Sequence, residues 1–193
     1  MAKLALLSVY NKDGIVEFAK SLIELGFSII SSGGTAKCLQ ENGVETSLVA
    51  DLVGGGPILG HRVVTLSREI HAALLATEKD SEELAELGIP RIDLVCVDLY
   101  PLQDEIDRPG ATLESIIEMT DIGGPCMLRS AAKGNRIVIS DFAQRVKVLK
   151  WLKDGEPNPE FIRNSLAIRA EEIVAYYCLV SAKARRDHAP DFD

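Results

Sequence analysis

A regular alternation of short apolar runs with segments of helical spacing constrains the fold of this chain more than any other feature of its sequence. Compact apolar runs predict buried strands at 4–10, 27–30, 44–49, 62–66, 92–100 and 136–140. Helical spacing predicts helices at 11–26, 68–76, 112–119, 141–153 and 161–186, with a short one ending at 42–43. Strands that alternate with helices predict a mostly parallel sheet, so we expect an α/β fold of three layers with helices on both faces.

The chain has 193 residues, which is enough for one domain with a sizeable core. No linker divides it, but helix-breaking residues at 154–160 separate a helical extension from the rest. We expect an α/β body at 1–153 and a helical extension of the same domain at 154–193.

The composition excludes some classes of function and leaves others open. A formal net charge of −8 argues against a nucleic-acid-binding protein, but not against a small phosphorylated ligand, for which a few local cations suffice. No run reaches about 20 apolar residues, and the first apolar run is too short and too soon followed by polar residues for a signal peptide, so we expect neither a membrane span nor a signal peptide. The four cysteines are scattered, which is typical of reduced thiols, so we expect a cytoplasmic protein without membrane association.

Polar residues follow several of the predicted strands, and the carboxyl ends of parallel strands are where such folds bind ligands. The sequence Ser-Ser-Gly-Gly-Thr at 31–35 follows the second strand and opens a helix. Free N–H groups at a helix start, with glycines that allow close approach, can hold an anion. Lys12, after the first strand, can add a cation. The alternative is a plain strand-to-helix turn capped by a hydroxyl.

A second glycine pair occurs in Asp-Ile-Gly-Gly-Pro at 121–125. Pro125 suits a helix start, since its missing N–H costs nothing there. Asp121 is either a helix cap or an acceptor for a proton or hydrogen bond from a ligand. Lys133 ends the small-residue run that follows, and helix geometry alone does not bring it to Asp121, because eight helical residues span about 12 Å.

Other candidate residues are less decisive. Tyr100 ends the most apolar strand and is either a hydrogen-bond donor at the sheet edge or part of the core. His61 and His71 lack the spacing of metal ligands, so we expect no metal site. The sequence contains neither a P-loop nor a nucleophile elbow.

Taken together, these motifs resemble the IMP cyclohydrolase domain, the N-terminal half of a bifunctional enzyme of purine biosynthesis that also carries a formyltransferase. The resemblance covers about residues 3–186 and rests on Ser-Gly-Gly-Thr-Ala-Lys at 32–37, Leu-Tyr-Pro at 99–101, Asp-Ile-Gly-Gly at 121–124 and Ala-Ala-Lys at 131–133. It implies the methylglyoxal-synthase-like α/β fold and a dimer. It also implies closure of the purine ring of formyl-AICAR to give IMP, with loss of water and without metal or coenzyme. A separate formyltransferase is then expected to supply the substrate.

The resemblance also implies roles for individual residues. It assigns the reacting atoms to Asp121, which helps deprotonate the carboxamide, and to Tyr100 and Lys133, which assist at the reacting carbonyls. It assigns substrate binding to two sets: Lys12, Ser32, Gly34 and Thr35 at the 5′-phosphate, and Arg62, Thr65, Ile122, Gly123 and Gly124 at the nucleotide.

The chain departs from the family pattern at several of these positions. Val64 stands where the family has a lysine, and valine can neither donate a proton nor bind an oxyanion. Arg68 follows nearby and is a candidate for replacing that charge. Asp98 stands where the family has asparagine, which adds negative charge near the pocket, and Tyr10 stands where it has serine.

Two alternatives follow from these departures. One is a phosphate- or nucleotide-binding regulatory module that keeps the fold and has lost the chemistry. The other is a methylglyoxal-synthase-like lyase, which the Asp-Ile-Gly-Gly and Leu-Tyr-Pro motifs fit less well. The apolar segment at 161–180 is either the dimer interface or a face that packs on its own sheet.

Overall fold

The computed structural model describes residues 3–60 and 62–188, and in this part of the chain five strands form one parallel sheet. Its order is β3-β2-β1-β4-β5, with strands β1 (Lys3–Ser8), β2 (Phe27–Ser31), β3 (Ser47–Leu48), β4 (Leu94–Val97) and β5 (Ile137–Ile139). This confirms the expected parallel α/β sheet. His61 lies outside the described residues.

The strand predicted at 62–66 is wrong. Val63 forms a single antiparallel bridge with Ile58, and the residues after it are bends rather than strand. Thr65 is buried and Val64 is partly buried against the core. The apolar run at 62–66 is therefore a half-buried loop at the edge of the sheet, and it does not pair with any described strand.

The predicted helices are present, and four shorter ones were not predicted. The predicted ones are α1 (Ile15–Glu24), α2 (Gly33–Glu41), α4 (Arg68–Leu75), α7 (Leu113–Glu118), α8 (Gly123–Lys133), α9 (Phe142–Lys153) and α10 (Pro159–His188). The others are α3 (Val49–Leu52), the 3₁₀ helix η1 (Glu78–Asp80), α5 (Ser81–Glu86) and α6 (Leu102–Asp107). These have three to six residues, and α7 is the one predicted helix that is as short.

Helices cover both faces of the sheet, as expected. On one face α1 packs on β2 and α9 on β5, and the two helices contact each other. On the other face α8 packs on β4 and β5 and contacts α4. Every residue of β4 and β5 is buried, as a strand covered on both faces requires.

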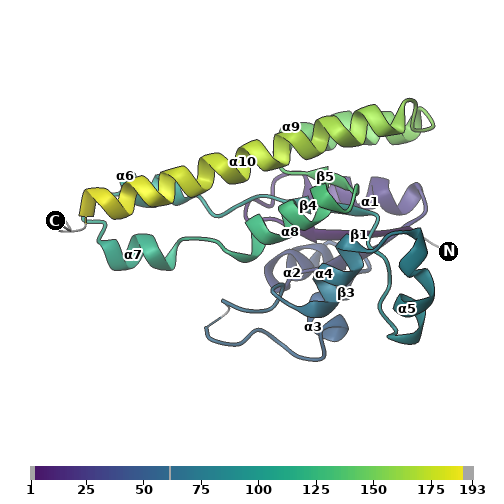
Figure 1. Ribbon diagram of the computed structural model, residues 1–193, viewed down its shortest axis with the longest axis horizontal. Helices are drawn as coiled ribbons and strands as arrows, with labels where there is room; N and C mark the ends of the chain where they lie inside the picture. Colours follow the sequence, from purple (N-terminus) through teal and green to yellow (C-terminus); the bar gives the residue numbers. More distant parts are fainter. Residues whose placement is uncertain (1–2, 61, 189–193) are drawn as a thin grey trace.

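The long helix α10 runs along one side of the molecule (Figure 1). It packs against α8 and β5, and its carboxyl-terminal part continues to α6 and α7 beyond the sheet. There it forms a second, small hydrophobic cluster of Leu102, Ile116, Tyr177 and Ala184, separate from the main core. The helix therefore joins two cores.

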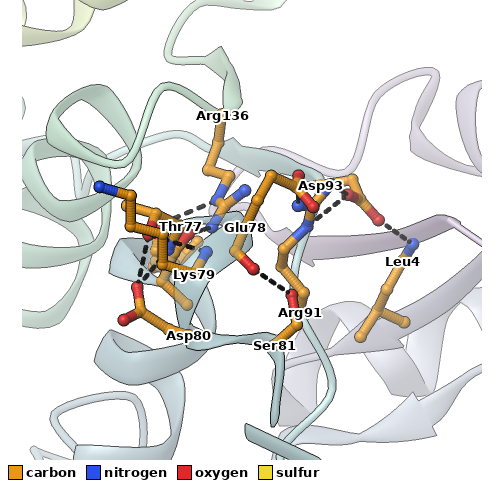
Figure 2. Close-up of polar contacts among 11 residues, drawn as sticks. Leu4, Thr77, Glu78, Lys79, Asp80, Ser81, Arg91, Asp93 and Arg136 are labelled. Carbon is orange, nitrogen blue, oxygen red and sulfur yellow. Dashed lines mark hydrogen bonds and ion pairs between the residues drawn. The ribbon is translucent and has the colours of Figure 1, made fainter. Parts of the chain in front are cut away.

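At the amino ends of the strands, ion pairs and hydrogen bonds connect the elements (Figure 2). The Asp93 carboxylate accepts a bond of 3.0 Å from the Leu4 N–H and pairs with Arg91 at 3.1 Å. The buried Arg136 donates from Nε to the Leu74 carbonyl at 2.8 Å and also bonds the Ala76 carbonyl. These contacts hold the end of α4 against the sheet and occupy the amino edge.

Candidate active site

A cavity of about 640 Å³ lies at the carboxyl ends of β1 and β4. These neighbouring strands are the point at which the strand order changes direction, since β2 and β3 lie on one side of β1 and β4 and β5 on the other. Ligands of open parallel sheets bind at such a point. Eleven of the twelve predicted site residues line the cavity: Lys12, Ser32, Gly34, Thr35, Arg62, Thr65, Tyr100, Asp121, Ile122, Gly123 and Gly124.

The start of α2 forms one wall. Ser32 precedes the helix, and its side chain caps no described N–H group of α2. Its hydroxyl instead accepts a bond of 2.9 Å from the Ser8 hydroxyl. The capped-turn alternative is therefore absent from the described residues, and the first N–H groups of α2 are left for a ligand. The buried Thr35 hydroxyl is used by the Val9 backbone, at 3.1 Å and 3.2 Å.

Lys12 lies beside the start of α2. Its ammonium nitrogen is 4.0 Å from the point where a Cβ on Gly34 would lie, which is ordinary van der Waals distance, so the ammonium lies next to the first turn of α2. It donates to the carbonyls of Val9 and, at 2.9 Å, of Tyr10. An ammonium has three donors, so one more bond to an anion is possible. Burial lowers the pKa of Lys12, and the Asp98 carboxylate opposes this shift.

The turn before α8 forms the opposite wall. The Asp121 carboxylate accepts a bond of 3.1 Å from the Gly124 N–H, so Asp121 does cap the helix. Burial raises the pKa of Asp121, and bonds from the backbone of Gly124 and Gly123 oppose the rise. Pro125 is the third residue of the helix rather than the first, still within the turn where a missing N–H costs nothing.

Gly123 and Gly124 are required by space rather than by backbone conformation, since neither has a positive φ. A Cβ on Gly123 would lie 2.5 Å from the Thr65 hydroxyl oxygen. A Cβ on Gly124 would lie 2.7 Å from a Leu99 methyl carbon and would also meet the Asp121 carboxylate. The two glycines therefore let the start of α8 approach the cavity closely.

A tyrosine of α10 holds the same turn. The Tyr177 hydroxyl oxygen accepts a bond of 2.8 Å from the Asp121 N–H, and the hydroxyl donates to the Met119 carbonyl at 3.3 Å. Burial raises the pKa of Tyr177 to about 12, so the phenol remains protonated. Tyr177 belongs to the apolar segment at 161–180, whose pattern does not predict this contact.

Tyr100 follows β4 and is half-exposed, so its phenol lies at the cavity rather than in the core. Its ring contacts that of Tyr10 edge to face, with centroids 5.7 Å apart. Burial raises the pKa of Tyr100, with a smaller contribution from the Asp121 charge. The phenol is therefore a hydrogen-bond donor at neutral pH.

The loop at 62–68 contributes the outer wall. Val64 lines the cavity, and Arg62 pairs at the mouth with Glu118 at 2.5 Å. Arg68 is exposed on α4, where its Nε lies 3.3 Å from Glu69, and it is not among the described residues that line the cavity.

Lys133 is the twelfth predicted residue. It is exposed at the last turn of α8, whereas Asp121 precedes the first, and it is not one of the described cavity residues. The 11 residues of α8 place the two ends about 16 Å apart. A role for Lys133 at the reacting atoms stays a prediction.

Three charged residues outside the predicted set line the cavity: Glu118, Asp98 and Arg185. Asp98 follows β4, and Arg185 belongs to the last turns of α10. The position of Asp98 after a buried strand is a signal that the sequence contains. Nothing in the sequence around Arg185 indicates that α10 reaches α7 and the cavity.

The described residues contain neither a cluster of three or more metal-ligating side chains nor a helix long and apolar enough to cross a membrane.

Three comparisons relate this chain to known proteins. Residues 14–126 match the MGS-like domain family. The bifunctional purine biosynthesis protein PurH of Persephonella marina is 45% identical over 92% of this chain and 35% of that protein. The proteins of the same name from Caldicellulosiruptor saccharolyticus and Bacillus cytotoxicus are 46% and 45% identical, over 92% and 94% of this chain. The chain thus spans little more than a third of the length of these relatives, 35% to 37%.

The fold also matches a solved structure. The crystal structure of ForH superposes with a TM-score of 0.85 at 36% sequence identity, over 98% of this chain and 100% of that one.

Proposed function

This chain belongs to the MGS-like domain family, and from that premise we propose that it is an IMP cyclohydrolase, which closes the purine ring of formyl-AICAR to give IMP. The observation that carries the proposal is the cavity itself. One cavity contains both the start of α2, suited to a phosphate, and the Asp121–Gly124 turn, suited to a base.

The reaction makes three demands on the protein. The carboxamide nitrogen of formyl-AICAR attacks the formyl carbon, so the substrate must be held folded. The nitrogen must lose a proton, and the oxygen on the former formyl carbon must be stabilised until it leaves as water.

The described geometry offers a group for each demand. The N–H groups of α2 and the Lys12 ammonium hold the 5′-phosphate, which fixes one end of the substrate. The Asp121 carboxylate accepts the carboxamide proton. The Tyr100 phenol donates to the developing oxyanion. None of these roles needs a metal or coenzyme.

A spectrophotometric assay with formyl-AICAR tests the proposal. We expect turnover by the wild-type protein and a large loss of turnover in an Asp121→Asn variant. A wild-type protein that forms no IMP from formyl-AICAR would show that the proposal is wrong.

One observation favours a second candidate, a nucleotide-binding regulatory module. Val64 lines the cavity where the resemblance implies a lysine, so one polar group is missing from an otherwise polar wall. Calorimetry with IMP distinguishes the two, because the module would bind IMP without converting formyl-AICAR.

We also propose that the protein acts as a homodimer and receives formyl-AICAR from a formyltransferase. Four large apolar residues of α10 support a dimer, since each is at least half-exposed: Phe161, Ile168, Tyr176 and Leu179. The relatives that match this chain are bifunctional by name, which supports the second expectation.

A further inference from the structure

Asp98 holds the loop that carries Lys12. Its carboxylate accepts one bond from the Tyr10 N–H and another, of 3.1 Å, from the Asn11 N–H. The Asn11 side chain in turn accepts a bond of 2.8 Å from the Asp13 N–H. A carboxylate can accept both bonds with separate oxygens, whereas an asparagine offers only one oxygen. The resemblance implies asparagine at this position, so this arrangement belongs to the aspartate.

Arg145 lies beneath the same loop. It extends from α9 and is 4% exposed, and it is not among the described residues that line the cavity. One terminal nitrogen donates to the Asp13 carbonyl at 2.9 Å, and the other lies 3.7 Å from an Asp98 oxygen. Its guanidinium also lies 5.1 Å from the centre of the Phe142 ring.

A buried arginine is costly unless an opposite charge accompanies it. Within the described residues, Arg145 Nε has no hydrogen-bond partner, and the polar groups beside the guanidinium are the Asp13 carbonyl, the Asp98 carboxylate and the Cys96 thiol. Asp98 is partly buried as well, with a side chain 22% exposed. Each of the two charges therefore compensates the other, and both form hydrogen bonds to the backbone of the loop at 10–13.

We propose that Arg145 is a positioning residue for the phosphate site. Paired with Asp98, it fixes the loop at 10–13 so that the Lys12 ammonium stays beside the start of α2. This inference rests on the proposed phosphate-binding role of that wall of the cavity. Arg145 itself touches no substrate, and its effect passes through Asp98 and the loop backbone.

The test compares binding of IMP with binding of inosine, which lacks the phosphate, by calorimetry on the full chain. Arg145→Met removes the charge and keeps most of the bulk. We expect it to weaken IMP binding about tenfold or more, and inosine binding by less than about twofold. Lys147→Met is the matched control, because Lys147 is an exposed cation on the same helix, and it should leave both affinities unchanged.

A second measurement follows the loop directly. Hydrogen exchange of the Tyr10 and Asn11 amides should accelerate in Arg145→Met and stay unchanged in the control. The Asp98→Asn and Arg145→Met changes should not be additive, because the double variant leaves no unpaired buried charge. If Arg145→Met does not fold, Arg145→Lys serves instead, since lysine keeps the charge but lacks the fork that reaches both partners.

Equal losses of IMP and inosine affinity, unchanged IMP affinity, or additive losses in the double variant would overturn the inference. Wild-type protein that binds inosine as tightly as IMP would overturn it too, because no phosphate site would exist. Wild-type protein that binds IMP but does not convert formyl-AICAR would overturn only the proposed reaction.

Discussion

Among single residues, Asp121 combines two opposed influences on one carboxylate. Burial favours the protonated form, and N–H groups at the start of α8 favour the ionised form. The net effect raises the pKa of Asp121 above its ordinary value of 3.8, which makes the carboxylate a better proton acceptor than a free one.

This shift predicts an acid limit to the reaction. Turnover needs ionised Asp121, so the rate should fall as the pH drops through a pKa above 3.8. Asp121→Asn should lower kcat by about 10²–10⁴-fold and remove that limb from the remaining activity. Stopped-flow rates measured across pH check both points, with Asp104→Asn on the exposed face of α6 as control. An acid limb that persists in Asp121→Asn would assign it to another group.

At position 64, by contrast, a substitution is expected to raise kcat. It already lines the cavity, so Val64→Lys would add a cation among the reacting groups and should raise kcat with formyl-AICAR by about tenfold or more. Arg68→Ala should leave kcat unchanged, because Arg68 points to Glu69 instead. A slower Val64→Lys enzyme, or a slower Arg68→Ala enzyme, would contradict this arrangement.

How far single residues could be predicted depends on whether they follow a strand. Lys12, Ser32 and Tyr100 follow buried strands, and parallel strands bring such positions to one edge, so the sequence predicted their neighbourhood. Arg145 and Arg185 are in helices whose sequences look like ordinary solvent-facing faces. Only the packing of these helices shows where their cations point.

At the scale of elements, α10 supports the wall of the site through Tyr177. Tyr177→Phe removes the acceptor of the Asp121 N–H and the donor to Met119. Loss of these half-buried bonds should lower the free energy of unfolding by about 1–2 kcal/mol and also reduce kcat. Urea denaturation and turnover measure the two effects.

The neighbouring Tyr176 provides the control for this change. It is 66% exposed on the same helix, and Tyr176→Phe keeps the apolar ring assigned to the proposed dimer and removes only the hydroxyl, so it should alter neither quantity. Equal behaviour of the two variants would mean that Tyr177 contributes through its ring alone.

Among elements, periodicity predicted the long helices and the buried strands. It failed where apolar residues are buried but do not pair with a strand. The loop at 62–66 is such a case, because its apolar residues pack against the core without joining the sheet. It also missed α5 and α6, which have six residues each and so make fewer than two turns, although it did predict the equally short α7.

At the scale of the whole molecule, a dimer would explain how Lys133 reaches a catalytic site. Lys133 and Asp121 lie at opposite ends of α8. In a homodimer whose twofold axis passes beside the middle of α8 and at right angles to it, the start of α8 in one copy would face the end of α8 in the other. Lys133 of one copy would then lie toward the cavity of its partner. Light scattering should accordingly give the mass of a dimer.

Mixed dimers test this arrangement. Asp121→Asn and Lys133→Ala should each be nearly inactive alone, and mixing them by unfolding and refolding should restore about a quarter of wild-type activity, because random pairing rebuilds one complete site in each mixed dimer. No recovery would mean that Lys133 acts within its own chain. Full activity of Lys133→Ala alone would show that Lys133 has no catalytic role.

The contact between Tyr177 and Asp121 also has a consequence for synthesis on the ribosome. All five strands and the residues of the α8 turn emerge before α10 does. A nascent chain that ends short of Tyr177 can complete its sheet, yet the Asp121 N–H then has water in place of the phenol. A chain that is still being translated therefore cannot bind substrate at this turn until α10 has been made, even though all the strands of the sheet have been made before it.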